Sequence, residues 1–187
     1  MPELRRVVLL GGMGVGKSSV GAELARRLGW QHVDLDREIE QRLGLSVAEV
    51  FQRHGAEVFR RLEAELTGEL AGASRLVLSP GGGWVTNPAL LPQVREGALV
   101  VWLTAAPETL LARLDAAPHE RRPLLAGPEP LTTLREILQA REPLYRAADL
   151  TLDTEGRSVA ELAARIQQHL RSARHGCEQD NPETNAR

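Results

Sequence analysis

The sequence has little of several residue types. Of its 187 residues one is a cysteine, Cys177, so an intrachain disulfide and a cysteine metal cage are excluded. A net charge of −2 gives no electrostatic footprint for DNA or RNA. The apolar stretch before the first glycines is too short for a signal peptide, and no apolar run approaches membrane-spanning length. We therefore expect one soluble, cytoplasmic domain that binds neither nucleic acid nor membrane.

The chain also has a single lysine, Lys17, which lies in the segment GGMGVGKS (residues 11–18). This segment matches G-x-x-x-x-G-K-[ST], the phosphate-binding loop, and it has the required strand-like run before it and helix-like run after it. The glycines let backbone N–H groups point at phosphates, and the helix start adds partial positive charge. Lys17 is expected to reach the β/γ-phosphates and Ser18 to hold Mg²⁺. The motif predicts nucleoside triphosphate binding and leaves the reaction open.

Short apolar runs alternate with amphipathic stretches. Strands are predicted at 6–10, 31–35, 75–79, 98–103 and 150–152, and helical segments at 17–28, 37–70, 88–94, 107–114, 131–145 and 158–170. This order predicts an α/β fold with a parallel sheet covered on both faces and ligands at the carboxyl ends of its strands. We expect one domain over residues 1–172, with an insertion at about 36–70, a lid at about 116–130 and a disordered tail at 173–187.

Two pairs of charged residues lie close to the carboxyl ends of the predicted strands, where ligands are expected. Asp34 and Asp36 are predicted to share one face of a strand end, which suits Mg²⁺ binding and proton transfer; a charged strand end or a helix cap is the alternative. Arg60 and Glu63 are i, i+3 on a predicted helix, and Glu63 could orient Arg60 toward an anionic substrate. The alternative for that pair is a solvated ion pair.

Glycines and arginines complete the set of candidate residues. Gly81, Gly82 and Gly83 follow the third strand and would let a ligand approach the backbone closely, although a tight turn is the alternative. Arg122 falls in the predicted lid, where an arginine can close over phosphates. Arg141 lies near a helix end beside a proline. For both arginines the alternative is an exposed surface position.

In this order and spacing, over roughly residues 5–170, the motifs resemble the shikimate kinase family. The matching pieces are GMGVGKS (12–18), DLD (34–36), FRRLE (59–63), GGG (81–83), RPLL (122–125) and REPLY (141–145). The resemblance implies a P-loop kinase fold, similar to nucleoside monophosphate kinases, with five parallel strands in the order 2-3-1-4-5. It also implies a monomer that uses ATP and Mg²⁺ to phosphorylate the 3-hydroxyl of shikimate, in aromatic amino acid biosynthesis.

The resemblance further implies roles for individual residues. The catalytic residues would be Lys17, Asp36 and Arg122. Nucleotide would be bound by Gly14, Val15, Gly16, Lys17, Ser18, Ser19, Arg122 and Arg157, with Arg113 also close to the adenine region. Shikimate would be bound by Asp36, Arg60, Gly82 and Arg141, the arginines pairing with its carboxylate. Mg²⁺ would be held near Ser18 and Asp34. Trp84 stands where a small residue is common in the family.

Three alternatives are another small-molecule kinase, a nucleotide-dependent switch and a silent binding module. A gluconate or nucleoside monophosphate kinase would share the architecture. The paired arginines favour a carboxylate, 3% aromatic residues offer little for the base pocket of a nucleotide acceptor, and a panel of acceptors with ATP would decide between these kinases. A GTPase switch would explain D-x-x-G at residues 153–156, yet N-K-x-D is impossible when the only lysine is Lys17. A catalytically silent binding module is disfavoured because none of the matched motifs is missing.

Overall fold

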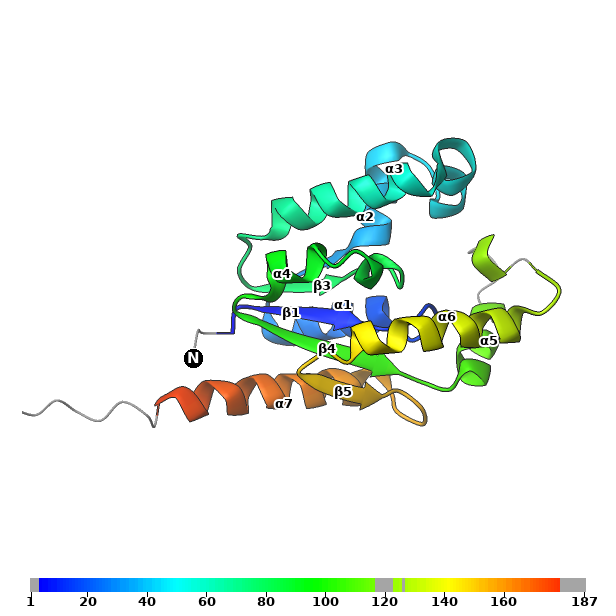
Figure 1. Cartoon of the computed structure of the whole chain (residues 1–187). Coiled ribbons are helices and arrows are strands. Elements are labelled where there is room, and N and C mark those ends of the chain that lie inside the picture. The colour runs from blue at the N-terminus through cyan, green and yellow to red at the C-terminus, as the bar shows by residue number, and fades with distance from the viewer. Residues whose placement is uncertain (1–3, 117–122, 126, 179–187) are drawn as a thin grey trace, which may run out of the picture.

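A parallel sheet forms the centre of the molecule. The computed structural model describes residues 4–116, 123–125 and 127–178. Within them, five strands pair in parallel in the order β2-β3-β1-β4-β5 (Figure 1). This arrangement confirms the predicted fold and strand order. The strands are β1 (Arg6–Leu10), β2 (Gln31–Asp34), β3 (Leu76–Ser79), β4 (Ala98–Thr104) and β5 (Leu150–Asp153).

Helices cover both faces of this sheet. They are α1 (Lys17–Leu28), α2 (Leu35–Leu43), α3 (Val47–Leu70), α4 (Leu90–Arg95), α5 (Pro107–Asp115), α6 (Pro130–Tyr145) and α7 (Val159–Glu178), with short 3-10 helices η1 (Trp84–Thr86) and η2 (Pro123–Leu125). In Figure 1, α3 and α4 lie above the sheet and α7 lies below it. The side chains of β1 alternate between the two layers. Val7 and Leu9 pack with α1 and α7, whereas Val8 and Leu10 pack with α3 and α4. Such two-sided burial is typical of a parallel sheet.

Local sequence sets several helix ends. Gly16 (φ 95°) precedes α1 and Gly29 (φ 63°) follows it, and both take the left-handed conformation that glycine allows without a steric penalty. Ser46 and Glu49 form the capping box that opens α3, in which each residue binds the backbone N–H of the other. Gly55 interrupts α3 with non-helical angles (φ 80°, ψ 171°), so two helical segments meet there at a kink.

The second strand ends earlier than predicted. Asp34 is the N-cap of α2, where its side chain accepts a hydrogen bond from the backbone N–H of Arg37 at 3.3 Å. Asp36 therefore lies in the first turn of α2, and the prediction that both carboxylates share one face of a strand is wrong. The cap takes precedence because it satisfies a backbone donor that a helix start leaves without a partner.

The C-terminal helix and the expected lid complete the description. Helix α7 continues to Glu178, so residues 173–178 are helical where a disordered tail is expected from the sequence; the rest of that tail lies outside the described residues. Of the expected lid, Leu125 packs against the core that contains α1 and α7, whereas Arg122 lies outside the described residues.

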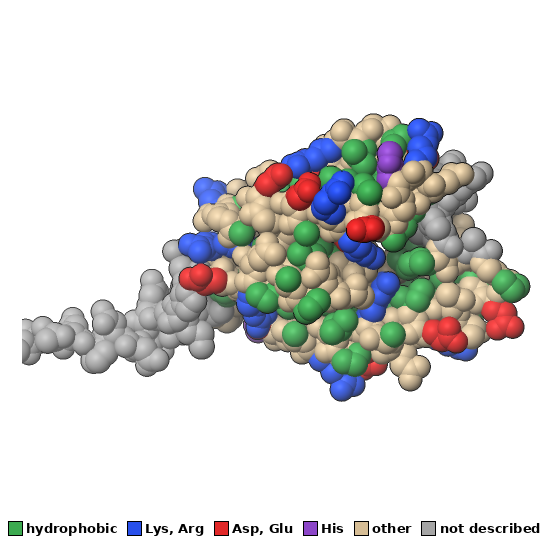
Figure 2. Space-filling view, turned by 45° about the horizontal axis from the view of Figure 1, so that its top comes forward, with side chains coloured by type: hydrophobic (Ala, Val, Ile, Leu, Met, Phe, Trp, Pro, Cys, Tyr) green, Lys and Arg blue, Asp and Glu red, His purple; other side chains and the backbone are tan. Residues whose placement is uncertain are grey.

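On the face shown in Figure 2, acidic and basic side chains are interspersed, and neither sign forms a continuous patch. Among the helices that the structure describes, none combines the length and apolarity needed to cross a bilayer.

Candidate active site

The phosphate loop follows β1 and leads into α1. Gly14 (φ 76°) and Gly16 (φ 95°) both have positive φ, which turns the backbone tightly enough to form a cradle. The Lys17 ammonium donates to the carbonyl oxygens of Gly11 (2.9 Å) and Gly12 (3.0 Å). Its charge is therefore held directly over the loop, at the N-terminal end of a helix, where anions bind.

Packing around this loop fixes its shape. A Cβ atom at Gly14 would lie 3.0 Å from the carbonyl oxygen of Leu110, so the loop is seated against α5. The side chain of Val15 is buried in the core, which leaves only its backbone to face a ligand. Ser19, in contrast, is exposed on the first turn of α1. The loop thus presents backbone N–H groups and hydroxyls, a lining suited to phosphate oxygens.

Ser18 and Asp34 place a hydroxyl and a carboxylate beside the phosphate loop. The Ser18 hydroxyl donates to Asp34 Oδ2, while Oδ1 of the same carboxylate caps α2. A hydroxyl and a carboxylate beside a phosphate cradle fit Mg²⁺, which takes hard oxygen ligands and keeps waters and phosphates in its other positions. Among the described residues, no three or more His, Cys, Asp or Glu side chains are grouped where they could hold a metal ion.

Ser79 supports the phosphate loop from behind and is a site residue that the sequence analysis missed. It ends β3, and its hydroxyl donates to the carbonyl oxygen of Lys17 at 3.2 Å. Its Oγ also lies 3.0 Å from Nε2 of His32, whose pKa is lowered by burial while Asp34 opposes that shift. The available signal was a polar residue closing the otherwise apolar strand 76–79.

The glycine loop after β3 is packed against two functional side chains. A Cβ atom at Gly81 would lie 2.6 Å from Asp36 Oδ1, and one at Gly83 would overlap the Arg60 guanidinium, 2.9 Å from its Cζ. Any larger residue at either position would have to push a charged group aside. The glycines therefore let α2 and α3 bring Asp36 and Arg60 onto the same loop.

Glu63 lies at the buried centre of a group of charged side chains beside the glycine loop (residues 81–83). Its side chain is fully buried, and Oε2 pairs with the Arg60 guanidinium. Burial raises the pKa of Glu63 to about 7; Arg60 and Arg141 oppose this shift, and Asp36 reinforces it. Oε1 has no hydrogen-bond partner among the described residues. Side chains from α2, α3 and α6 thus form one electrostatic cluster beside the glycine loop.

Gly82 lies where the glycine loop meets the phosphate loop. Its carbonyl oxygen accepts a hydrogen bond from Tyr145 Oη at 2.7 Å, and Tyr145 stacks on Trp102 with ring centroids 5.8 Å apart. Burial raises the pKa of Tyr145, with Arg141 acting in the opposite direction. A Cβ atom at Gly82 would lie 3.3 Å from the backbone nitrogen of Met13, so the glycine loop touches the phosphate loop. A ligand bound at the glycine loop would therefore lie next to a ligand bound at the phosphate loop.

Two further arginines lie at the carboxyl end of β5. Arg113 donates to Thr154 Oγ1 (2.9 Å), and Arg157 donates to the carbonyl oxygen of Asp153 (2.6 Å). They approach the same short segment from α5 and from the connection to α7. The structure therefore brings together two of the residues that the sequence associates with the nucleotide.

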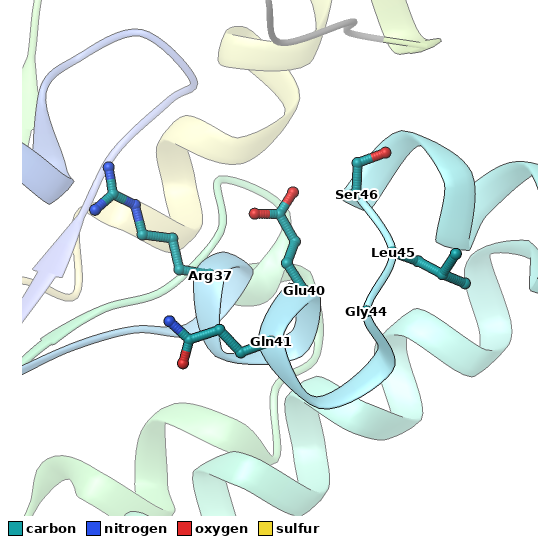
Figure 3. A pocket seen from close by; sticks show the side chains of 6 residues that line it. All are labelled: Arg37, Glu40, Gln41, Gly44, Leu45 and Ser46. Carbon is teal, nitrogen blue, oxygen red and sulfur yellow. The ribbon is translucent and has the colours of Figure 1, made fainter.

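A hollow of about 480 Å³ lies beside α2 and is lined by Arg37, Glu40, Gln41, Gly44, Leu45 and Ser46. Arg37 and Glu40 extend from α2, and Ser46 lies across the hollow from Glu40 (Figure 3). The Glu40 carboxylate accepts from the backbone N–H of Val47 at 2.9 Å, so it helps to cap α3. The hollow is thus shaped by the α2–α3 connection and does not contain the charged cluster around Glu63.

A phosphate loop on a five-stranded parallel sheet, facing a second loop with its own charged cluster, defines a P-loop kinase. A gluconokinase from Sinorhizobium meliloti shares this fold, with a TM-score of 0.62 at 19% identity over 97% of this chain and 100% of that structure. That likeness concerns the fold alone.

Closer similarity identifies the family. The family model for shikimate kinase matches residues 13–171. A shikimate kinase from Moorella thermoacetica is 44% identical over 166 residues, which cover 89% of this chain and 94% of the relative. The structure of shikimate kinase from Acinetobacter baumannii in complex with shikimate superposes with a TM-score of 0.84 at 35% identity, over 91% of this chain and 94% of that one. The chain belongs to the shikimate kinase family and is a kinase.

Proposed function

We propose that this kinase transfers the γ-phosphoryl group of ATP to the 3-hydroxyl of shikimate, a step in aromatic amino acid biosynthesis. The observation that carries the proposal is the contact between Gly82 and the phosphate loop, because it places a cradle for phosphates beside a cluster suited to a small hydroxylated anion. The Acinetobacter relative was solved with shikimate bound, which supports this acceptor.

On the nucleotide side, the backbone of Gly14, Val15 and Gly16 and the hydroxyls of Ser18 and Ser19 surround the phosphates. The Lys17 ammonium moves from its own loop carbonyls to the β/γ-phosphates, where it offsets the charge that develops during transfer. Arg113 and Arg157 border the adenine. Arg122, which lies outside the described residues, is assigned to the phosphates as the arginine of a closing lid.

On the acceptor side, Arg60 and Arg141 bind the carboxylate of shikimate, and the backbone of Gly82 contacts its ring. Asp36 binds the hydroxyls and takes the proton of the 3-hydroxyl. The 3-oxygen of shikimate forms a bond to the γ-phosphorus while the bond from that phosphorus to the β–γ bridging oxygen breaks, and ADP leaves. Glu63 holds the Arg60 guanidinium in position through its buried ion pair.

Ser18 and Asp34 are the residues that would hold Mg²⁺, directly or through water. When bound, the ion would supply positive charge that offsets the negative charge of the phosphates. We further propose that the protein acts as a monomer in the cytoplasm, as a single domain that includes α7.

The test is a steady-state assay of ADP formation with ATP and one of three acceptors: shikimate, gluconate or AMP. Shikimate should be preferred by at least about tenfold in kcat/KM. AMP lacks the carboxylate that Arg60 and Arg141 would pair with, and gluconate, which has one, carries its hydroxyls on an open chain and not on a ring. Phosphorus NMR should locate the product phosphate on the 3-oxygen. Equal rates with gluconate, or ADP formation that does not depend on any acceptor, would contradict the proposal.

A further inference from the structure

Trp84 occupies an unusual place in the core. It follows Gly83 directly, opens η1 and is fully buried. An indole buried in this way needs a partner for its N–H group, because an unsatisfied buried donor is costly. Trp84 Nε1 donates to Thr67 Oγ1 at 2.9 Å. The residue after the glycine loop is thereby bonded to the last turn of helix α3.

Thr67 makes a second hydrogen bond, which leads toward the charged cluster around Glu63. It is fully buried, and its hydroxyl donates to the carbonyl oxygen of Glu63, one turn earlier in α3, at 2.6 Å. A hydroxyl has one proton, so donation to Glu63 leaves a lone pair for Trp84. The three groups therefore form a directed chain of hydrogen bonds from the glycine loop to the residue that pairs with Arg60.

Two neighbouring points thus join the glycine loop to α3. The first is the close approach of Gly83 to the Arg60 guanidinium, and the second is the bond between Trp84 and Thr67. The guanidinium is the flexible end of a side chain, so the bond between Trp84 and Thr67 is the contact that holds the last turn of α3 against the glycine loop. This matters here because the kink at Gly55 separates this part of α3 from the segment that the capping box anchors.

We propose that Trp84 and Thr67 are positioning residues, which hold Arg60 and Glu63 in register with the glycine loop and so determine affinity for the acceptor. This inference rests on the proposed function, since the acceptor assigned to Arg60 is shikimate. Neither residue touches the phosphate loop in the contacts above, so nucleotide affinity should not depend on them. Displacements of about 1 Å in a positioned substrate can cost up to about 10²-fold in rate, so a small rotation of α3 suffices.

The test compares four variants by their KM for shikimate and for ATP. Trp84→Phe keeps an aromatic ring and removes the N–H group, and Thr67→Val keeps the shape and removes the hydroxyl. Both should raise the shikimate KM by about threefold or more and leave the ATP KM within about twofold. Thr67→Ser keeps the hydroxyl and should restore the wild-type shikimate KM. Thr133→Val is the matched control, because Thr133 makes the same bond to a carbonyl four residues earlier, on α6, at 3.1 Å and exposed.

A double variant sharpens the comparison. If one hydrogen bond carries the effect, Trp84→Phe combined with Thr67→Val should raise the shikimate KM no further than the larger single change. Lower melting temperatures with an unchanged shikimate KM in both single variants would show a merely structural role and overturn the inference. Should Thr67→Val fail to fold, Trp84→Phe alone decides by the same criterion. An inactive wild-type protein would refute the proposed function together with this inference, whereas an active one with unaffected variants would refute this inference alone.

Discussion

Glu63 should make the stability of the protein depend on pH in an unusual direction. Its pKa is about 7 in the fold, raised from 4.5 by burial. Because the folded protein binds this proton more tightly than the unfolded chain does, the stabilisation from this group is complete below about pH 4.5 and is lost as pH rises through about 7. A shift of this size corresponds to about 3 kcal/mol in the free energy of unfolding.

Glu63→Gln isolates this contribution, because the amide keeps the shape of the side chain and does not titrate. Urea denaturation of both proteins from pH 5 to pH 8 gives the free energy of unfolding at each pH. The wild-type value minus the variant value should fall by about 2 to 3 kcal/mol over this range, since part of the effect already lies below pH 5. Other titrating groups cancel in that difference.

Glu65→Gln is the matched control. Glu65 lies on the same helix, and its side chain is 55% exposed and 3.7 Å from Arg61. The free energy of unfolding of the wild type minus that of Glu65→Gln should stay constant within about 0.5 kcal/mol from pH 5 to pH 8, as expected of a surface pair. A constant difference for Glu63→Gln as well would refute the reasoning, because it would mean that Arg60 and Arg141 outweigh the burial of the carboxylate.

Three substitutions test the assigned roles. Lys17→Met should lower kcat by about 10²-fold or more with an unchanged circular dichroism spectrum, because it removes the cation over the phosphate loop; near-normal turnover would exclude that role. Asp36→Asn should reduce turnover while calorimetry shows ATP binding intact, and the reverse pattern would reassign Asp36 to the nucleotide. Arg60→Lys should raise the shikimate KM about tenfold, because an ammonium cannot replace a bidentate guanidinium, whereas Arg61→Lys should not; equal effects would make Arg60 an ordinary surface residue.

Local sequence predicted much of the fold. Strand β1 and helix α1 have the predicted bounds, because a run of buried aliphatic residues and two left-handed glycines specify them without help from distant contacts. The boundary between β2 and α2 was less predictable, since Asp34 can end a strand or cap a helix. The cap prevails, with Oδ1 accepting from the N–H of Arg37 and Oδ2 from Ser18.

The interior of the candidate site depended on tertiary contacts. The spacing of Arg60 and Glu63 predicts that they are neighbours, but only packing shows that Glu63 is fully buried. The partner of Trp84 lies 17 residues away on another element, so no local pattern could identify Thr67. The support from Ser79 likewise reaches across 62 residues to Lys17.

The contact between Gly82 and the phosphate loop bears on how the family can diverge. Backbone atoms form both sides of it, so no side-chain rotamer determines the interval between the two loops. That interval follows from the pairing of β1 with β3, the strands from which the two loops emerge. This chain and the Moorella relative share 44% of aligned residues, so more than half differ. Exchanges among aliphatic residues can therefore accumulate in the core and on the surface without altering the path of the transferred group, provided that this strand pairing and Gly82 remain.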